Sequence, residues 1–200
     1  MNRNRLPDGL CRTVLREGVR PTRFVLVISI AEQRMALYER ERELDREPAD
    51  EPGGGKQAGR RFPAYGFREQ FRVSTSRFGA GQEMHSNRTP LGLHRIARKV
   101  GGGDPIGTVF KSRRPIGFTW EGQLRPEIVH RILWLEGLEP GRNRGGNVDT
   151  FARYVYIHGF GDETTLGRPQ SRGCVHLSAS DLLPLYDRLP AGTLVWIAER

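Results

Sequence analysis

Two histidines, a cysteine and several glycines lie close together in residues 157–178, IHGFGDETTLGRPQSRGCVHLS. A thiolate is a strong nucleophile, but a free cysteine is mostly protonated at neutral pH and needs a neighbouring base. His158 ends a strand-like run that would hold its imidazole in place, and Cys174 lies in a tight Ser-Arg-Gly-Cys turn. In that turn Arg172 could stabilise a thiolate, and Gly173 would let successive backbone N–H groups point at a developing oxyanion. These residue types in this order predict a cysteine–histidine site for acyl transfer.

Two other interpretations of the same residues stay open. A lone cysteine is more often a small buried apolar side chain than a nucleophile, and a histidine at a strand end is usually structural. A metal site would take His158, Cys174 and His176 as ligands. Asp162 or Glu163 would have to complete it, and the spacing is not one that zinc sites commonly use. The sequence therefore predicts no metal site, and it implies no cofactor.

The composition limits the class of protein. The chain has 200 residues and a net charge of +9, so it suits one domain with a core that needs no disulfide or metal. The charge favours polyanionic surroundings: nucleic acid, an anionic membrane surface or an acidic cell-wall polymer. No aromatic-plus-basic nucleic-acid motif is present, so nucleic acid is not an expected partner. The apolar stretch 24–30 is too short to cross a bilayer, and no signal peptide is visible. Cys11 lies in a charged segment, so we expect both cysteines to be free thiols.

Hydrophobic patterning predicts a mainly β fold, sandwich-like with mixed sheets, with long loops and one clear helix after the cysteine. The stretch 127–137 fits either a strand or a helix. The helix is expected at 178–189, with Leu182, Leu185, Tyr186 and Leu189 on one face, a serine cap, and Pro184 near its first turn. Strands are expected at residues 24–30, 33–40, 71–76, 91–97, 153–159 and 193–198. Residues 41–70 are polar and rich in proline and glycine, which predicts a surface insertion.

The order of motifs resembles the L,D-transpeptidase catalytic domain. His-Gly at 158–159 and SRGCVHL at 171–177 match that family's catalytic signature, and LGRP precedes the second motif as in the family. FRVSTS followed by TPLGLHRI, the first hairpin and the closing TLVWI are also similar to the family, so the likeness extends over about residues 23–198. We therefore expect an N-terminal extension at 1–22 and a catalytic domain at 23–200 that carries the polar insertion at about 41–70.

The resemblance implies a β-rich domain with the cysteine pocket at one end and a peptidoglycan stem peptide as substrate. Cys174 would attack the carbonyl that precedes a terminal D-residue, with His158 as general base and the Gly159 carbonyl orienting the imidazole. Backbone N–H groups around Gly173 and Cys174 would form the oxyanion hole, and Ser171 would shape the turn. An amine of a second stem or of an anchored protein would then resolve the acyl-enzyme.

This chain departs from the family pattern at positions that border the substrate. Arg172 stands where many members have histidine, and His176 stands where many have arginine or asparagine. Phe160 and Gly161 replace the more usual threonine and asparagine. We expect Ser171, Arg172, His176 and Phe160 to contact the substrate.

Three classes of function therefore compete. The first is an L,D-transpeptidase, or an L,D-carboxypeptidase if water resolves the intermediate. The second is a cysteine peptidase or amidase that acts on another peptide. The third is a non-enzymatic binder of anionic polymer. The substrate of the first class implies a place in the cell envelope or periplasm, with contact to an anionic cell-wall or membrane surface as a further expectation.

Overall fold

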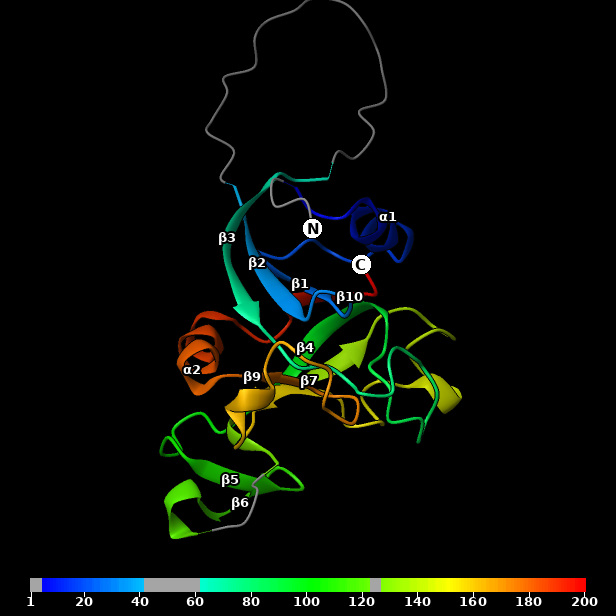
Figure 1. The fold of residues 1–200 in the computed structure, drawn as a ribbon. Coiled ribbons are helices and arrows are strands. Elements are labelled where there is room, and N and C mark those ends of the chain that lie inside the picture. The colour runs from blue at the N-terminus through cyan, green and yellow to red at the C-terminus, as the bar shows by residue number, and fades with distance from the viewer. Residues whose placement is uncertain (1–4, 42–61, 123–126) are drawn as a thin grey trace, which may run out of the picture.

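The computed structural model describes residues 5–41, 62–122 and 127–200. A ten-stranded sheet and two α-helices make up this part of the chain, so the predicted mainly β class with mixed strand directions is confirmed (Figure 1). The strands are β1 (Phe24–Ser29), β2 (Arg34–Arg40), β3 (Tyr65–Arg72), β4 (Gly92–Val100), β5 (Thr108–Lys111), β6 (Arg114–Phe118), β7 (Val129–Gly137), β8 (Tyr156–Gly159), β9 (Val175–Leu177) and β10 (Leu194–Ala198). The helices are α1 (Asp8–Arg16) and α2 (Ala179–Arg188), with short 3₁₀ turns at Thr119–Glu121, Gly146–Val148 and Glu163–Thr165.

The sheet has the strand order β3-β2-β1-β10-β4-β7-β5-β6, and β8 and β9 branch from β7. The β1–β10 and β8–β9 pairs are parallel, and the other pairs are antiparallel. β1 is buried along its whole length, which explains why its sequence is a continuous apolar run rather than an alternating one. The mixed sheet therefore has both faces of its first strand covered.

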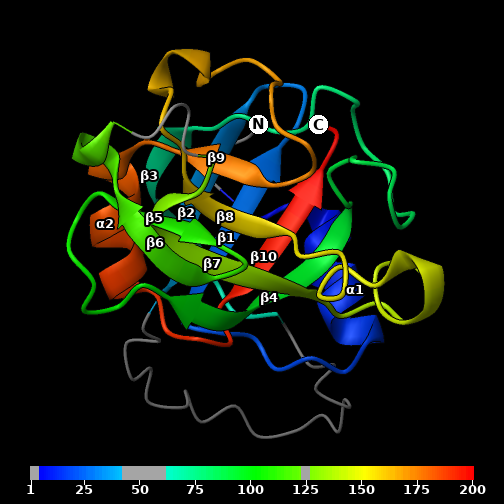
Figure 2. The same cartoon turned by 90° about the horizontal axis from the view of Figure 1, so that it is seen from below.

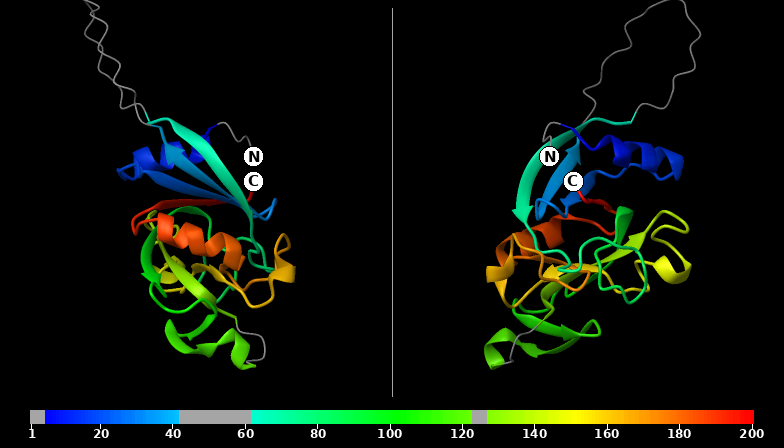
Figure 3. Two further views of the ribbon diagram at one scale, coloured as in Figure 1. Left: turned by 90° about the vertical axis from the view of Figure 1, so that its left-hand side faces the viewer. Right: turned by 45° about the vertical axis from the view of Figure 1, so that its right-hand side comes forward.

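The two helices cover opposite faces of β1 and its neighbours (Figure 3). On one face Leu26 and Ile28 join a core cluster with Leu182 and Leu185 of α2. On the other face Val25 and Val27 join a second cluster with Leu6, Leu10 and Val14 around α1. Ser178 caps α2 as expected, its hydroxyl accepting the Asp181 N–H at 3.2 Å. Pro184 lies in the second turn of α2 rather than the first.

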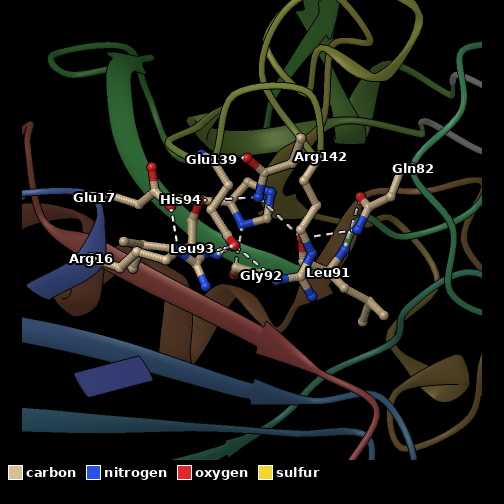
Figure 4. A network of polar contacts seen from close by, with 10 residues as sticks. Arg16, Glu17, Gln82, Leu91, Gly92, Leu93, His94, Glu139 and Arg142 are labelled. Atoms are coloured by element: carbon tan, nitrogen blue, oxygen red, sulfur yellow. Dashed lines mark hydrogen bonds and ion pairs between the residues drawn. The ribbon is translucent and has the colours of Figure 1, made fainter. Parts of the chain in front are cut away.

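The helix α1 was not predicted. Leu6, Leu10 and Val14 are spaced four residues apart, which is the pattern of a buried helix face, but the surrounding charges obscure it. Arg16 at the end of α1 donates to the Glu139 carboxylate at 2.8 Å, although Glu139 is only 2% exposed (Figure 4). The same carboxylate accepts the Arg142 side chain and the Leu93 backbone N–H. The N-terminal segment thus shares its core and a buried ion-pair network with the sheet.

Other boundaries differ from the sequence-based expectations in detail. Residues 65–70, assigned above to the polar insertion, form most of β3 and pair with β2, while residues 42–61 of the insertion lie outside the described part of the chain. The ambiguous stretch 127–137 contains the strand β7. The hairpin β5–β6 and the short strand β9 were not predicted, because each is brief and flanked by polar or glycine-rich sequence.

Candidate active site

The parallel pair β8–β9 brings the predicted site residues together. Its register sets Ile157 opposite Val175 and His158 opposite His176. Side chains alternate between the faces of a strand, so the apolar Ile157 and Val175 enter the core while both histidines share the other face. The two imidazole rings are 4.9 Å apart between centroids. Cys174 directly precedes β9 and, two residues before His176, belongs to the histidine face.

The imidazole of His158 is held in one tautomer. Its Nδ1 lies 2.8 Å from the Gly159 carbonyl oxygen, which can only accept, so Nδ1 carries the proton and Nε2 has the free lone pair. His158 is buried, and burial lowers its pKa to about 4, against the opposing effect of the Gly159 hydrogen bond. Its ring is therefore neutral near pH 7. A side chain at Gly159 would clash, because a Cβ there would lie 2.7 Å from the Val129 carbonyl oxygen.

Cys174 is a free, partly exposed thiol. Its Sγ lies 3.7 Å from the Tyr154 carbonyl oxygen, to which the thiol can donate. Burial raises the pKa of the Cys174 thiol to about 11, with the Tyr156 backbone N–H and the Arg153 charge opposing this shift. The side chain packs against an aromatic cluster that includes Tyr156 and Trp134. The resting site thus combines a protonated thiol with a neutral imidazole.

The turn before Cys174 depends on glycine and serine. Gly173 has φ +115°, a conformation that side chains with a Cβ rarely adopt, and a Cβ there would approach the Arg88 carbonyl oxygen to 3.3 Å. The Gly173 N–H donates to the Ser171 hydroxyl at 3.2 Å, and that hydroxyl donates to the Cys174 carbonyl at 2.5 Å. In the resting structure the Ser171 hydroxyl therefore accepts the hydrogen bond of the Gly173 N–H, which was expected to point at the oxyanion.

His176 and Phe160 form one wall beside His158. Their rings stack with centroids 4.2 Å apart and an interplanar angle of 14°. The pKa of His176 is lowered to about 2, mainly by burial and to a smaller extent by the nearby His158, so this ring is also neutral. Its Nδ1 is buried and has no hydrogen-bond partner within the described residues. His176, which was expected to contact the substrate, thus has a buried ring nitrogen that no described residue uses.

A hairpin that the sequence did not reveal covers the thiol side of this face. Phe110 of β5 packs in the cluster with Trp134 and Tyr156 against which Cys174 lies. Figure 2 looks onto the hairpin β5–β6, with β7 and β8 behind it. At its tip Arg113 donates to the Tyr156 hydroxyl at 3.1 Å. The site is therefore enclosed by residues from four separate parts of the chain.

The comparison with known proteins identifies the family. The model of the L,D-transpeptidase catalytic domain, known as YkuD, matches residues 23–197. The chain belongs to the L,D-transpeptidase catalytic domain family. No curated protein matches the sequence.

A solved structure supports the fold of this L,D-transpeptidase-family chain. The structure of Bd1075 from Bdellovibrio bacteriovorus is similar with a TM-score of 0.51 at 12% identity, covering 90% of this chain and 49% of that one. L,D-transpeptidase 3 from Mycobacterium tuberculosis gives a TM-score of 0.47 at 16% identity, covering 88% of this chain and 61% of that one. This chain thus spans about half to three fifths of the length of these two proteins.

The arginine whose charge lowers the pKa of the Cys174 thiol is Arg153, not Arg172. Arg172 is exposed, whereas the charge of Arg153 lowers the pKa of Cys174 against the larger effect of burial. Arg153 also holds the loop around residues 81–88, donating to the carbonyl oxygens of Gln82 at 2.8 Å and Arg88 at 2.6 Å. An arginine just before a strand gives no sequence signal for such a role. It connects the turn before Cys174 to a neighbouring cleft of about 660 Å³, lined by Gly81, Gln82, Glu83, Ser86, Arg88, Gly141, Arg142 and Val148.

The geometry gives no support to a metal site of the kind considered above. Across the described ranges, no three histidine, cysteine or acidic side chains are grouped closely enough to hold a metal ion. Asp162 instead accepts the Thr164 N–H at 3.1 Å within a 3₁₀ turn. Glu163 accepts the Ala179 N–H at 2.7 Å at the start of α2. Both candidate carboxylates therefore have structural partners.

Proposed function

We propose that this chain is an L,D-transpeptidase that acts on peptidoglycan stem peptides through an acyl-enzyme on Cys174. Membership of the family supports the reaction class. The observation that carries the proposal is the hydrogen bond from His158 Nδ1 to the Gly159 carbonyl, because it leaves Nε2 as the proton acceptor on the face that Cys174 shares. The carbonyl takes the place that an acidic residue has in many catalytic triads.

In the first half-reaction Cys174 Sγ attacks the carbonyl carbon that precedes the terminal D-residue, and His158 Nε2 takes the thiol proton. The C–N bond of the tetrahedral intermediate then breaks, and the imidazolium returns the proton to the leaving amine. A thioester on Cys174 remains. Because the pKa of the thiol is about 11 and that of the imidazole about 4, the resting pair is neutral and proton transfer accompanies the attack.

In the second half-reaction an amine attacks the thioester, His158 removes a proton from it, and the thiol is regenerated. The amine would come from a second stem or an anchored protein, and water in its place would make the protein an L,D-carboxypeptidase. The oxyanion would be stabilised by the N–H groups of Cys174 and Gly173. For Gly173 this requires the Ser171 hydroxyl to give up the hydrogen bond that it now accepts.

The wall formed by Phe160 and His176, together with Ser171 and Arg172 in the turn, is proposed to contact the stem peptide. No cofactor takes part in this scheme. Peptidoglycan as substrate places the protein in the cell envelope, where the net charge of +9 would favour contact with anionic cell-wall or membrane surfaces. No helix in the described part of the chain is long and apolar enough to cross a membrane.

Defined tetrapeptide stems, with products identified by mass spectrometry, test the proposal. Cross-linked dimer is the expected product. Release of the terminal D-residue alone would indicate a carboxypeptidase, and turnover only of substrates without D-centres would indicate another peptidase or amidase. Binding of polymer without turnover would favour the non-enzymatic alternative.

The identity of the nucleophile is tested separately. Cys174→Ala should abolish covalent acylation, while Cys11→Ala, the matched change at the other thiol, should not. A carbapenem-type β-lactam should add one inhibitor mass on Cys174, because its ring opens on a sulfur held beside an oxyanion hole. An adduct on Cys11, or a covalent substrate adduct on the Cys174→Ala variant, would contradict the assignment.

A further inference from the structure

The tip of the hairpin β5–β6 holds an arginine against the aromatic side chains that lie beside Cys174. The Arg113 guanidinium donates to the Tyr156 hydroxyl at 3.1 Å and lies 4.7 Å from the ring centroids of both Trp134 and Tyr154. These contacts hold the guanidinium at one position over three aromatic side chains. All three border the thiol, since Tyr154 supplies the carbonyl that accepts from Cys174, and Trp134 and Tyr156 belong to the cluster against which Cys174 packs.

The positive charge of Arg113 has no acidic partner within the described residues. Other arginines of the chain form ion pairs, including Arg16 with Glu139 and Arg188 with Glu69. The neighbours of Arg113 are neutral rings and a phenol, and one of the five guanidinium N–H groups is used by Tyr156. The remaining N–H groups form a fork that matches the two oxygens of a carboxylate. The aromatic cluster beside Cys174 therefore carries a positioned cation with unused donors.

The backbone at this tip indicates that the turn itself does not favour an arginine. Ser112 has φ +50° and Arg113 has φ +65°, both in the left-handed region. Two-residue hairpin turns of this kind favour asparagine, aspartate and glycine, because other residues are strained there. Backbone strain of this kind concentrates at functional sites, where the surrounding contacts hold it. In this hairpin the contacts of Arg113 with the aromatic side chains hold the strained turn.

The proposed reaction supplies a carboxylate close to the reacting carbonyl. The terminal D-residue of the donor peptide carries its α-carboxylate only a few bonds from the carbonyl that Cys174 attacks. We propose that Arg113 binds this carboxylate, so that it selects donors with a free C-terminus and positions the leaving residue. The inference rests on the proposed function and assigns a specificity-determining role to one residue of the hairpin.

The test combines two donors with three forms of the protein. The donors are a tetrapeptide stem with a free terminal carboxylate and the same stem as its terminal carboxamide. The native chain should prefer the carboxylate donor on the order of ten- to hundredfold in kcat/KM, the range expected for hydrogen bonds to a charged group. Arg113→Gln should reduce that preference to within about threefold. The control Arg114→Gln removes the same charge from the next residue of the hairpin, which is exposed, and should keep the native preference.

The outcomes distinguish a failure of the role proposed for Arg113 from a failure of the proposed function. Equal losses on both donors in Arg113→Gln would show that Arg113 only latches the hairpin, and would overturn the inference while leaving the proposed function intact. Lack of turnover of both donors by the native chain would overturn the proposed function and this inference with it. If Arg113→Gln does not fold, Arg113→Lys replaces it. Arg113→Lys keeps the positive charge but loses the forked guanidinium. Its preference for the carboxylate donor should lie between that of the native chain and about threefold. A preference equal to that of the native chain would overturn the inference.

Discussion

The ionisation state of Cys174 can be measured directly from its alkylation rate. A thiol reagent such as iodoacetamide reacts with the thiolate, so the rate follows the thiolate fraction. With the pKa of Cys174 at about 11, that fraction is roughly 10⁻⁴ at pH 7 and 10⁻² at pH 9. In a Cys11→Ser background, we therefore expect the alkylation rate to rise about a hundredfold between pH 7 and pH 9 without a plateau.

The same chain unfolded in guanidinium is the control. An unperturbed cysteine has a pKa of about 8.5, so its alkylation rate should rise steeply only to about pH 8.5 and then level off. Comparing the two pH profiles, rather than absolute rates, removes the effect of steric shielding in the folded state. The difference between the profiles isolates the effect of burial on the thiol.

A different charge state would give a different profile. If Cys174 and His158 rested as a thiolate–imidazolium pair, alkylation would already be fast near pH 6 and nearly independent of pH up to 8. Such a plateau would refute the neutral resting pair and the coupled proton transfer derived from it. Addition of stem peptide should slow alkylation at every pH, because the reagent and the substrate compete for the same sulfur.

Three further predictions follow from the buried side chains. His158→Ala should lower the acylation rate by on the order of 10²–10⁴, whereas His176→Asn should change it about tenfold or less; the reverse order would exchange their roles. Leu10→Ala should lower the unfolding free energy, measured by denaturant titration, by about 2–5 kcal/mol. On the same helix Leu15 is 50% exposed, so Leu15→Ala should lower it by about 0.5 kcal/mol or less. Equally small losses for both variants would mean that α1 does not pack on the sheet. Burial lowers the pKa values of His94, His158 and His176 to about 3, 4 and 2, whereas a histidine in the unfolded chain has a pKa of about 6.5. The unfolded chain therefore binds more protons below pH 6.5, so the stability that these neutral side chains contribute is present above pH 6.5 and is lost as the pH falls toward the folded pKa values. Unfolding free energy should therefore drop by about 1 kcal/mol per histidine between pH 7.5 and 5.5, and His176→Asn should reduce that drop by about a third; a drop that His176→Asn leaves unchanged would contradict the burial of this imidazole.

The sequence carries the local features of this fold and little of its long-range geometry. The strand β1 and the helix α2 were predictable because their apolar residues follow the periods of a buried strand and an amphipathic helix. The motif residues His158 and Cys174 were recognisable from their types and order. Their shared face could not be foreseen, because it results from the parallel register of β8 and β9, which local patterns do not encode.

The residues that sequence analysis missed act from outside the motif. Arg153 and Arg113 reach the site through tertiary contacts, and an arginine in either position carries no local signal of its role. The turn at the tip of the β5–β6 hairpin lacks the glycine or asparagine that usually marks a hairpin. The helix α1 is a different case, since the spacing of Leu10 and Val14 was visible but its charged surroundings favoured a loop.

The position of the last strand has a consequence for the order in which the molecule can form. β10 lies between β1 and β4, so the most C-terminal of the described strands is an interior strand of the sheet. Until residues 194–198 leave the ribosome, β1 and β4 have no common neighbour, and each lacks the strand that pairs with it on that side. Contacts of such long sequence separation form late and slowly. The nascent chain must therefore stay incompletely folded until residues 194–198 have emerged, with its hydrophobic strands exposed to chaperones or aggregation up to that point.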